Sequence, residues 1–280
     1  MFFRVKFYTN QLFGDVMLRY FRFADYYIET FAKRLSGRGL MNPNTNGEFK
    51  VLENVVKKSK GSLCFLDGGS NIGEHILKFD NLCKKYDVRT PTIIAVEPFP
   101  STIEVLKKNV SNVTCHLIEK ALGREKGNVK FYSENGNGIS GQNSAIQHYY
   151  LNHVTDIEQT TIDIIAEDYG LKKIDFLKLD IEGFEYNALM GAQRVLSEGL
   201  VDYIQLEYNQ TWIEGGGTIK KILDICDKYS YNLYRIRKND LLSIPSYNFN
   251  IEDFFYCNLL LVRSGCDLPL TSTRKAIPLI

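Results

Sequence analysis

The chain has 280 residues, of which 44% are hydrophobic and 24% are charged, so it can bury a core as ordinary globular proteins do. This composition excludes a disordered tail protein, a collagen-like chain and a small disulfide scaffold. Because 34 Lys and Arg residues stand against 33 Asp and Glu residues, the chain lacks a net positive field that could hold a phosphate polymer. We therefore expect no nucleic-acid partner.

The six cysteines are scattered, and no two of them are separated by only two residues. This spacing excludes a zinc knuckle and a thioredoxin-like redox motif, and it fits a reducing compartment. After Met1–Lys6, the chain shows no uncharged apolar run long enough for a secretory signal or a membrane span. We therefore expect a cytoplasmic protein.

Residues 1–46 are predicted to form a helical appendage, and residues 47–280 the main domain. Apolar residues between Phe13 and Leu35 recur at three- and four-residue spacing, which indicates one amphipathic helix. We expect its apolar face to pack on the main domain or on a second subunit, which would make a homo-oligomer. The aromatic bias of this segment leaves contact with a membrane surface as the weaker alternative.

From residue 62 onward, apolar runs typical of β-strands alternate with helix-patterned stretches, which predicts a doubly wound α/β fold with helices on both faces. Two final strands follow without a helix between them, so they are expected to pair antiparallel. The predicted strands are residues 63–66, 93–96, 114–118, 176–179, 201–206, 232–236 and 254–262, and the predicted helices are residues 74–86, 101–109, 185–196 and 219–229. In such sheets, ligands bind beyond the carboxyl ends of the strands.

The first strand ends in the glycine-rich string FLDGGSNIGEH, residues 65–75. Gly69 and Gly73 permit a tight turn and a close approach of backbone to ligand, and the next helix points free amides toward it. Asn71 places a side chain where a dinucleotide fingerprint has glycine, so a pyrophosphate would be crowded. Asp67 suits a ligand that carries an amine and a sulfonium. The alternative is a plain strand–helix connection.

The second strand ends at Glu97, whose carboxylate can accept both hydrogens of a ribose diol. The alternative for Glu97 is a favourable charge at the start of the next helix. After the third strand, the backbone around Ala121 is expected to border an adenine, with Glu119 assisting.

The fourth strand carries Lys178 and Asp180 on one face, and a lysine in a central strand needs a partner. Asp180 and Glu207 are the carboxylates within reach, and Glu182 and Glu185 crowd the same rim. The alternative is a satisfied ion-pair network in which Glu185 starts the next helix.

The blocks FLDGGSNIG, AVEPFPSTIEVLKKNV, EKALGREKG, TTIDIIAEDYG and IDFLKLDIEGFEYNALMGA together resemble the FkbM-type S-adenosylmethionine-dependent methyltransferases, over about residues 47–207. Gly68 and Ser70 stand where that family usually has Val and Ala. The resemblance implies a class I (Rossmann-like) methyltransferase fold with a mostly parallel seven-stranded sheet. It also implies S-adenosylmethionine as the donor and, most often, transfer to a hydroxyl oxygen of a glycan or secondary metabolite.

On this reading, one set of residues holds the cofactor and a second set acts on the acceptor hydroxyl, whose proton must be removed. Asp180 is the first candidate for positioning or general base, Glu182 and Glu207 are the second, and Lys178 tunes them or stabilises the developing alkoxide. The predicted cofactor-binding residues are Asp67, Gly69, Ser70, Asn71, Gly73, Glu97, Pro98, Glu119, Ala121 and Asp180.

A metal is not expected, because no histidine–carboxylate spacing demands one, although the carboxylate rim leaves a divalent cation as an alternative. His75 has capping or packing as its alternative to a functional role. The polar, aromatic stretch of residues 133–160 is predicted to be an acceptor-binding loop, with a disordered insertion as the alternative. Its candidate residues are Ser140, Asn143, Ser144, His148 and Tyr149.

The predicted function is therefore O-methyl transfer from S-adenosylmethionine to a hydroxyl of a sugar, a glycan or a related small molecule. A nicotinamide-dependent oxidoreductase is disfavoured by Asn71 and by the 30 residues from Asp67 to Glu97, against about 20 expected. A non-catalytic cofactor-binding scaffold, with the N-terminal helix docking a partner, is a further alternative.

Overall fold

The computed structural model describes residues 26–28, 31, 37–59, 61–133, 144–146 and 153–273. The predicted helix between Phe13 and Leu35 lies outside these residues, except that residues 26–28 and 31 are helical. Within the described ranges, no helix has both the length and the apolar character needed to cross a membrane.

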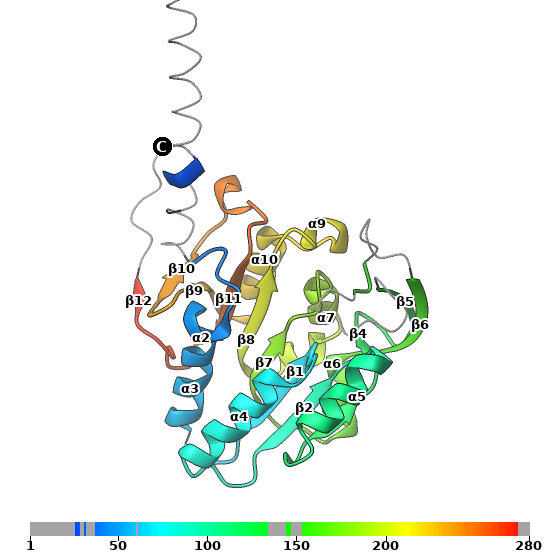
Figure 1. Cartoon of the computed structure of the whole chain (residues 1–280). Helices are drawn as coiled ribbons and strands as arrows, with labels where there is room; N and C mark the ends of the chain where they lie inside the picture. Colours follow the sequence, from blue (N-terminus) through cyan, green and yellow to red (C-terminus); the bar gives the residue numbers. More distant parts are fainter. Residues whose placement is uncertain are drawn as a thin grey trace, which may run out of the picture.

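A central β-sheet organises the described chain (Figure 1). Its strands are β1 (Cys64–Gly68), β2 (Thr92–Val96), β3 (His116–Ile118), β7 (Ile174–Leu179), β8 (Val201–Tyr208), β9 (Tyr231–Ile236), β10 (Leu241–Ser243), β11 (Cys257–Arg263) and β12 (Ser272–Thr273). They lie in the order β12-β10-β9-β11-β8-β7-β1-β2-β3. β11 runs antiparallel to both β8 and β9, whereas β3, β2, β1, β7 and β8 pair in parallel. The predicted parallel sheet with an antiparallel ending is confirmed.

Helices cover both faces of this sheet, because neighbouring residues of each buried strand point to opposite sides. Phe65 and Phe176 pack with apolar residues of α3 (Glu48–Lys58), α4 (Glu74–Lys85) and α5 (Pro100–Asn109). Leu66 and Leu177 face the other side, where α6, α7, α8 and α10 lie. These helices span Ile162–Asp168, Glu185–Met190, Gln193–Ser197 and Ile219–Tyr229, and the short α2 and α9 span Pro43–Asn46 and Trp212–Gly215.

Three features differ from the sequence-based expectations. The sheet has nine strands among the described residues instead of seven, because the short β10 and β12 extend its edge beyond β9. The predicted helix of residues 185–196 is two helices, α7 and α8. At the break, Gly191 lies so close to Gly123 that an added Cβ would be 2.1 Å from its carbonyl oxygen. A small separate sheet, β4-β6-β5 (Ala121–Leu122, His153–Thr160 and Gly127–Ser133), was not expected.

The strand order reverses at β1, since β2 and β3 continue on one side of it and β7 and β8 on the other. Such a switch point separates the turns that follow neighbouring strands and leaves a crevice at the carboxyl edge. The turns after β1, β2, β7 and β8 all open at that edge, and they carry the glycine-rich string, Glu97, Asp180, Glu182 and Glu207.

Candidate active site

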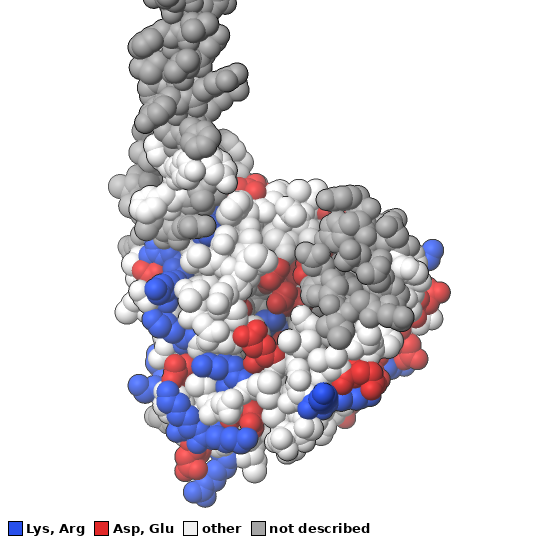
Figure 2. Space-filling view, viewed as in Figure 1, with Lys and Arg blue, Asp and Glu red and all other residues white. Residues whose placement is uncertain are grey.

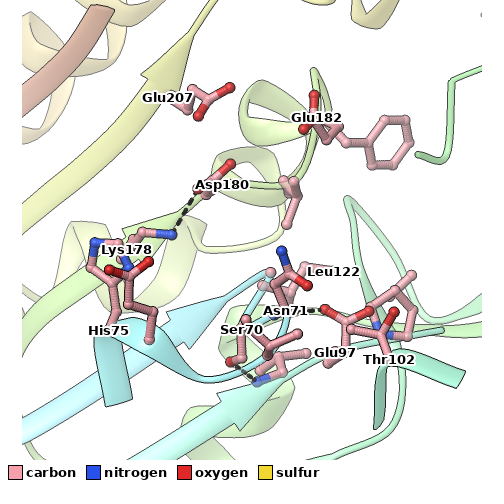
Figure 3. Close-up of a pocket in the computed structure, with 18 of the residues that line it drawn as sticks. Ser70, Asn71, His75, Glu97, Thr102, Leu122, Lys178, Asp180, Glu182 and Glu207 are labelled. Carbon is pink, nitrogen blue, oxygen red and sulfur yellow. Dashed lines mark hydrogen bonds and ion pairs between the residues drawn. The ribbon is translucent and has the colours of Figure 1, made fainter. Parts of the chain in front are cut away.

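A pocket of about 310 Å³ opens at the carboxyl edge of the sheet. Figure 2 shows it as a hollow in which acidic side chains gather. The turn after β1 and Glu97 border one end, and the residues after β7 and β8 border the other (Figure 3). The lining includes Gly69, Ser70, Asn71, His75, Glu97, Pro98, Thr102, Ala121, Leu122, Lys178, Asp180, Glu182, Glu207 and Tyr256.

The glycine-rich turn after β1 is fixed to its neighbours on both sides. Gly69 and Ser70 donate backbone N–H groups to Val96 O at 2.9 and 3.0 Å, and Ser70 Oγ accepts from Val96 N at 3.1 Å. Gly69 has φ = 78°, and an added Cβ would lie 1.8 Å from the carbonyl oxygen of Asp180. The glycine is therefore needed for contact between this turn and the turn after β7, and its expected approach to a ligand stays a prediction.

Glu97 joins the turn after β1 to the start of α5. Its Oε2 accepts from Asn71 N at 3.0 Å, and its Oε1 accepts from Phe99 N at 3.1 Å. Burial raises the pKa of Glu97 to about 7, although these two backbone donors oppose the shift. A carboxylate offers about four acceptor positions, so two remain on this pocket-lining residue for a diol.

Asp67 is not among the lining residues of the pocket, and its expected contact with the cofactor stays a prediction. Its side chain is buried beneath the turn, and its Oδ1 lies 3.7 Å from Lys178 Nζ. Burial raises the pKa of Asp67, and the positive charge of Lys178 acts in the opposite direction. Asp67 is therefore placed to hold Lys178.

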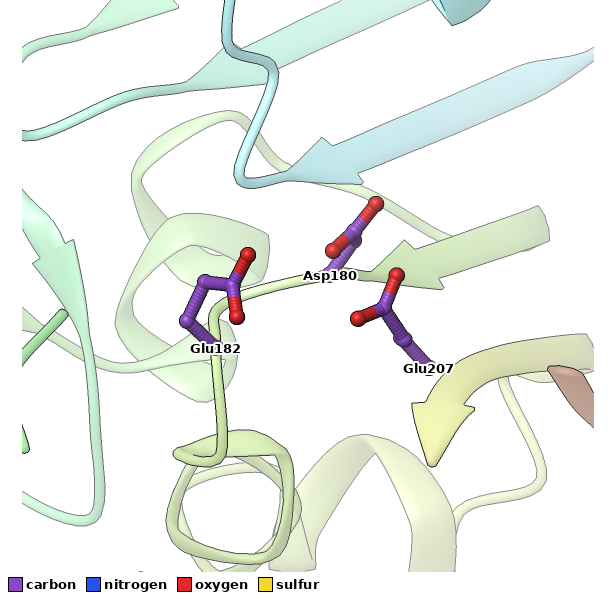
Figure 4. A group of neighbouring side chains, drawn as sticks. All are labelled: Asp180, Glu182 and Glu207. Carbon is purple, nitrogen blue, oxygen red and sulfur yellow. The ribbon is translucent and has the colours of Figure 1, made fainter. Parts of the chain in front are cut away.

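Three carboxylates converge at the other end of the pocket (Figure 4). Asp180, Glu182 and Glu207 each present an oxygen within 4.8 Å of the other two, a geometry that could also hold a divalent cation. Lys178 Nζ lies 3.0 Å from Asp180 Oδ2 and supplies a positive charge there. Asp180 and Glu207 were the predicted partners of Lys178, and the ion pair confirms Asp180.

The three carboxyls differ in their affinity for a proton. Burial would raise the pKa of Asp180, but Lys178 holds it below its usual range. Burial raises the pKa of Glu182 to about 8, and the charges of Asp180 and Glu185 add to the shift. Burial and the charge of Asp180 also raise the pKa of Glu207 well above its ordinary value. The cluster can therefore hold a proton near neutral pH.

The turn that carries Glu182 is held in an unusual conformation. Glu182 has φ = 53°, which is uncommon for a residue other than glycine, and Ser144 Oγ donates to its carbonyl oxygen at 2.8 Å. Glu185 Oε1 accepts from Ile181 N and Gly183 N at 2.9 and 3.3 Å, so Glu185 closes the turn. Glu185 is also the first residue of α7, the position that the alternative gave it. Such strain persists only where the surroundings enforce it.

Not every predicted site residue reaches the pocket. Glu119 is half exposed and pairs with Lys107 at 2.7 Å, outside the lining. Ser144 is buried and contacts the backbone of Glu182 instead of the pocket. Pro98 and Ala121 do line it, as does His75, whose ring also packs on Phe49. Ser140, Asn143, His148 and Tyr149 lie outside the described residues.

Sequence reasoning missed several lining residues. Thr102 and Leu122 each follow a motif that was identified, so a wider window around Glu97 and Ala121 would have included them. Met41, Glu48 and Tyr256 carry no local signal, because only the tertiary fold brings them to this pocket.

Residues 67–235 match the family model of the methyltransferase FkbM domain, which covers more than half of the chain. The chain belongs to this family. It is 24% identical over 207 residues to the 2-O-methyltransferase NoeI of Sinorhizobium fredii (strain NBRC 101917 / NGR234), covering 68% of this chain and 82% of that protein.

Solved methyltransferase structures also align with the chain. An O-methyltransferase from Bacillus cereus in complex with SAH aligns with a TM-score of 0.44 and 9% identity, covering 86% of this chain and 90% of that one. Precorrin-6y C5,15-methyltransferase from Geobacter metallireducens GS-15 aligns with a TM-score of 0.39 and 11% identity, covering 78% and 88%.

This chain is therefore a methyltransferase, with S-adenosylmethionine as its cofactor. The family match favours methyl transfer over the nicotinamide-dependent alternative. The pocket suits such a ligand. Asn71 Oδ1 and Thr102 Oγ1 are buried atoms of the lining without a hydrogen-bond partner among the described residues. Buried polar atoms of this kind cost stability unless a ligand or water pairs with them.

Proposed function

We propose that this methyltransferase transfers the methyl group to a hydroxyl oxygen of a sugar, a glycan or a related small molecule. The observation that carries the proposal is the cluster of Asp180, Glu182 and Glu207 in the same pocket as the glycine-rich turn. An alcohol must lose a proton when it is methylated, and carboxylates near the oxygen can accept it. The relative NoeI, named a 2-O-methyltransferase, supports transfer to oxygen.

The cofactor end of the pocket is the end formed by the turn after β1 and by Glu97. S-adenosylmethionine, when bound, supplies an electrophilic methyl group on a positively charged sulfur. We assign Glu97 to the ribose hydroxyls, because its two remaining acceptor positions face the pocket. Asn71 and Thr102 offer their unpartnered oxygens to donors of the ligand, and Pro98, Ala121 and Leu122 form apolar walls.

The acceptor end divides two tasks among its carboxyls. Asp180 stays ionised beside Lys178, so it can accept a hydrogen bond from the acceptor hydroxyl and orient it. Glu207 and Glu182 have raised pKa values, and a general base works best when its pKa lies near the working pH. We therefore assign proton removal to Glu207 or Glu182 and positioning to Asp180, a change from the initial ranking. Lys178 can stabilise negative charge that develops on the oxygen.

The test is transfer of labelled methyl groups from S-adenosylmethionine to the glycan fraction of cells that naturally carry the protein. We expect Asp180→Asn and Glu207→Gln to lower the turnover about 100-fold, while cofactor affinity measured by calorimetry changes less than about threefold. Asp224→Asn on the exposed side of α10 is the matched control and keeps wild-type turnover.

Two outcomes would contradict the proposal. If label enters nucleic acid or protein instead of the glycan fraction, the acceptor class is wrong. If both variants keep wild-type turnover, the carboxylate cluster takes no part in the reaction.

A measurement of turnover with and without a chelator tests the alternative that the carboxylates hold a divalent cation. We expect EDTA to leave the rate unchanged, because Lys178 already supplies a positive charge next to Asp180.

A further inference from the structure

One wall of the pocket comes from a segment that precedes the family-matched residues. Residues 37–48 lie against the ends of β9 and β11, where Gly39 N donates to Tyr256 O at 2.7 Å. Arg38 pairs with Asp253 at 2.8 Å. Gly47 has φ = 106° and packs so closely that an added Cβ would be 2.1 Å from the carbonyl oxygen of Arg237. These contacts fix the segment on the rest of the fold.

Glu48, at the start of α3, anchors the inner end of this segment. Its side chain is 5% exposed, and its carboxylate accepts from Gln205 Nε2 at 2.5 Å and from Asn258 Nδ2 at 2.8 Å. Asn46 Nδ2 also donates to it, and His75 Nε2 lies 3.3 Å away. The buried carboxyl group is thus held by donors from α2, β8 and β11, which fixes this wall where it meets the three carboxylates.

The outer part of the wall combines the apolar residues Met41 and Pro43 with the polar phenol of Tyr256. Met41 is 75% exposed yet lines the pocket together with Pro43. Tyr256 lines the same pocket and supplies a polar group. Burial raises the pKa of Tyr256, and the nearby charges of Glu207 and Glu48 raise it further, so its phenol keeps its proton and can donate a hydrogen bond.

We propose that residues 37–48 and Tyr256 form the acceptor subsite, and that this subsite takes an uncharged, hydroxylated ring such as a neutral sugar. A sugar ring has a C–H surface that suits Met41 and Pro43. Its hydroxyl groups suit the Tyr256 phenol and the Glu207 carboxylate. An anionic ring would meet Glu48, Asp180 and Glu207 with only Lys178 as a buried cation among the described lining residues. This inference rests on the proposed function.

These residues lie outside residues 67–235, the part that matches the family model. The family-matched part supplies the cofactor end and the three carboxylates, whereas the flanking segments supply the wall that meets the acceptor. On this proposal, the choice of acceptor is encoded by segments outside the family-matched residues.

The first test measures how much of the glycan fraction is needed for half-maximal labelling. We expect Met41→Ala and Tyr256→Phe each to raise this amount about fivefold, the loss typical of one contact, with cofactor affinity unchanged within about twofold. Phe249→Ala, an equally exposed apolar residue outside the pocket lining, is the matched control and leaves both quantities unchanged. Unchanged half-saturation in both variants overturns the subsite, whereas continued labelling of the glycans leaves the proposed function standing.

The second test does not need turnover. Saturation-transfer NMR is recorded on the protein with S-adenosylhomocysteine and a mixture of the methyl glycosides of glucose, galactose, mannose and rhamnose. We expect signals from ring C–H protons that Met41→Ala and Tyr256→Phe weaken at least about twofold, and no signals from glucuronic acid methyl glycoside. No signal from any neutral glycoside, or an equal signal from the uronate, overturns the inference.

Discussion

Lys178 links the two ends of the pocket through its two carboxylate neighbours. Its Nζ lies 3.7 Å from Asp67 Oδ1, beneath the cofactor turn, and 3.0 Å from Asp180 Oδ2, at the reacting end. Burial alone would lower the pKa of Lys178, but the charges of Asp180 and Asp67 raise it above its ordinary value. The lysine therefore stays charged, and the position of Asp180 depends on a residue buried under the cofactor turn.

Glu97 gives the residue-scale prediction for cofactor binding. Glu97→Ala removes a carboxylate from the pocket, and we expect the free energy of S-adenosylmethionine binding to weaken by about 1.5 to 3 kcal/mol, the range for hydrogen bonds to a charged group. Isothermal titration calorimetry measures it. Glu119→Ala is the matched control, because Glu119 pairs with Lys107 away from the pocket. Equal affinities of the two variants would remove Glu97 from the cofactor site.

The turns after β1 and β7 form one interlocked unit. Gly69 lies against the carbonyl of Asp180, and Asp180 N in turn donates to Gly68 O at 3.0 Å. Each turn also has a non-glycine residue at positive φ, Asn71 at 46° and Glu182 at 53°. Both strained residues line the pocket, so the strain is located where ligand-facing side chains must be aimed.

Gly69→Ala tests this interlocking at the scale of the two elements. The added Cβ would lie 1.8 Å from a backbone oxygen, so one turn has to move, and the positive φ adds strain. We expect the free energy of unfolding to fall by more than about 3 kcal/mol in urea titrations, with loss of cofactor binding in the folded fraction. Gly127→Ala is the control, because nothing lies within 4 Å of its added Cβ. If Gly69→Ala lowers the free energy of unfolding no more than Gly127→Ala does, the two turns are independent of each other.

Much of the fold was predictable from elements whose patterning is local. The strands and helices of the parallel half, the antiparallel pairing of β9 and β11 and the carboxylates after β2, β7 and β8 all follow from apolar runs and their ends. Gly191 shows where this fails, because the break between α7 and α8 depends on a backbone contact with Gly123, far away in the sequence. The contact of Asp67 with Lys178 could not be predicted for a similar reason, since the register of β1 and β7 sets it. The assignment of the site residues stays a prediction.

At the scale of the whole molecule, the pocket is built on a segment that precedes the predicted boundary between residues 46 and 47. Asn46 and Glu48, on either side of that boundary, bond to each other and are both buried. The division of the chain at this point stays a prediction. Within the predicted appendage, Gly39 N donates to Tyr256 O and Arg38 pairs with Asp253, so at least this part of it packs with the domain.

The concentration of buried acids gives a prediction for the stability of the ligand-free protein. Burial raises the pKa of Glu97 and Glu185 to about 7 and that of Glu182 to about 8, from the ordinary value of 4.5. The folded protein therefore binds more protons than the unfolded chain between pH 4.5 and 8. Stability falls as pH rises wherever the folded state binds more protons, so the contribution of these groups is retained below about pH 4.5 and lost as pH rises through 7 to 8.

Glu185 gives the clearest test of this pH dependence, because its side chain is fully buried and its Oε2 has no hydrogen-bond partner among the described residues. We expect the wild-type free energy of unfolding to be lower at pH 8.5 than at pH 5.5. Glu185→Gln should reduce that difference by up to about 3 kcal/mol, since the amide keeps an oxygen for Ile181 N but cannot ionise. Glu198→Gln, on the surface beside Arg194, is the control and should leave the difference unchanged. Urea titrations at the two pH values measure both variants, and an unchanged difference in Glu185→Gln would show that this carboxyl is ionised at little cost in the folded protein.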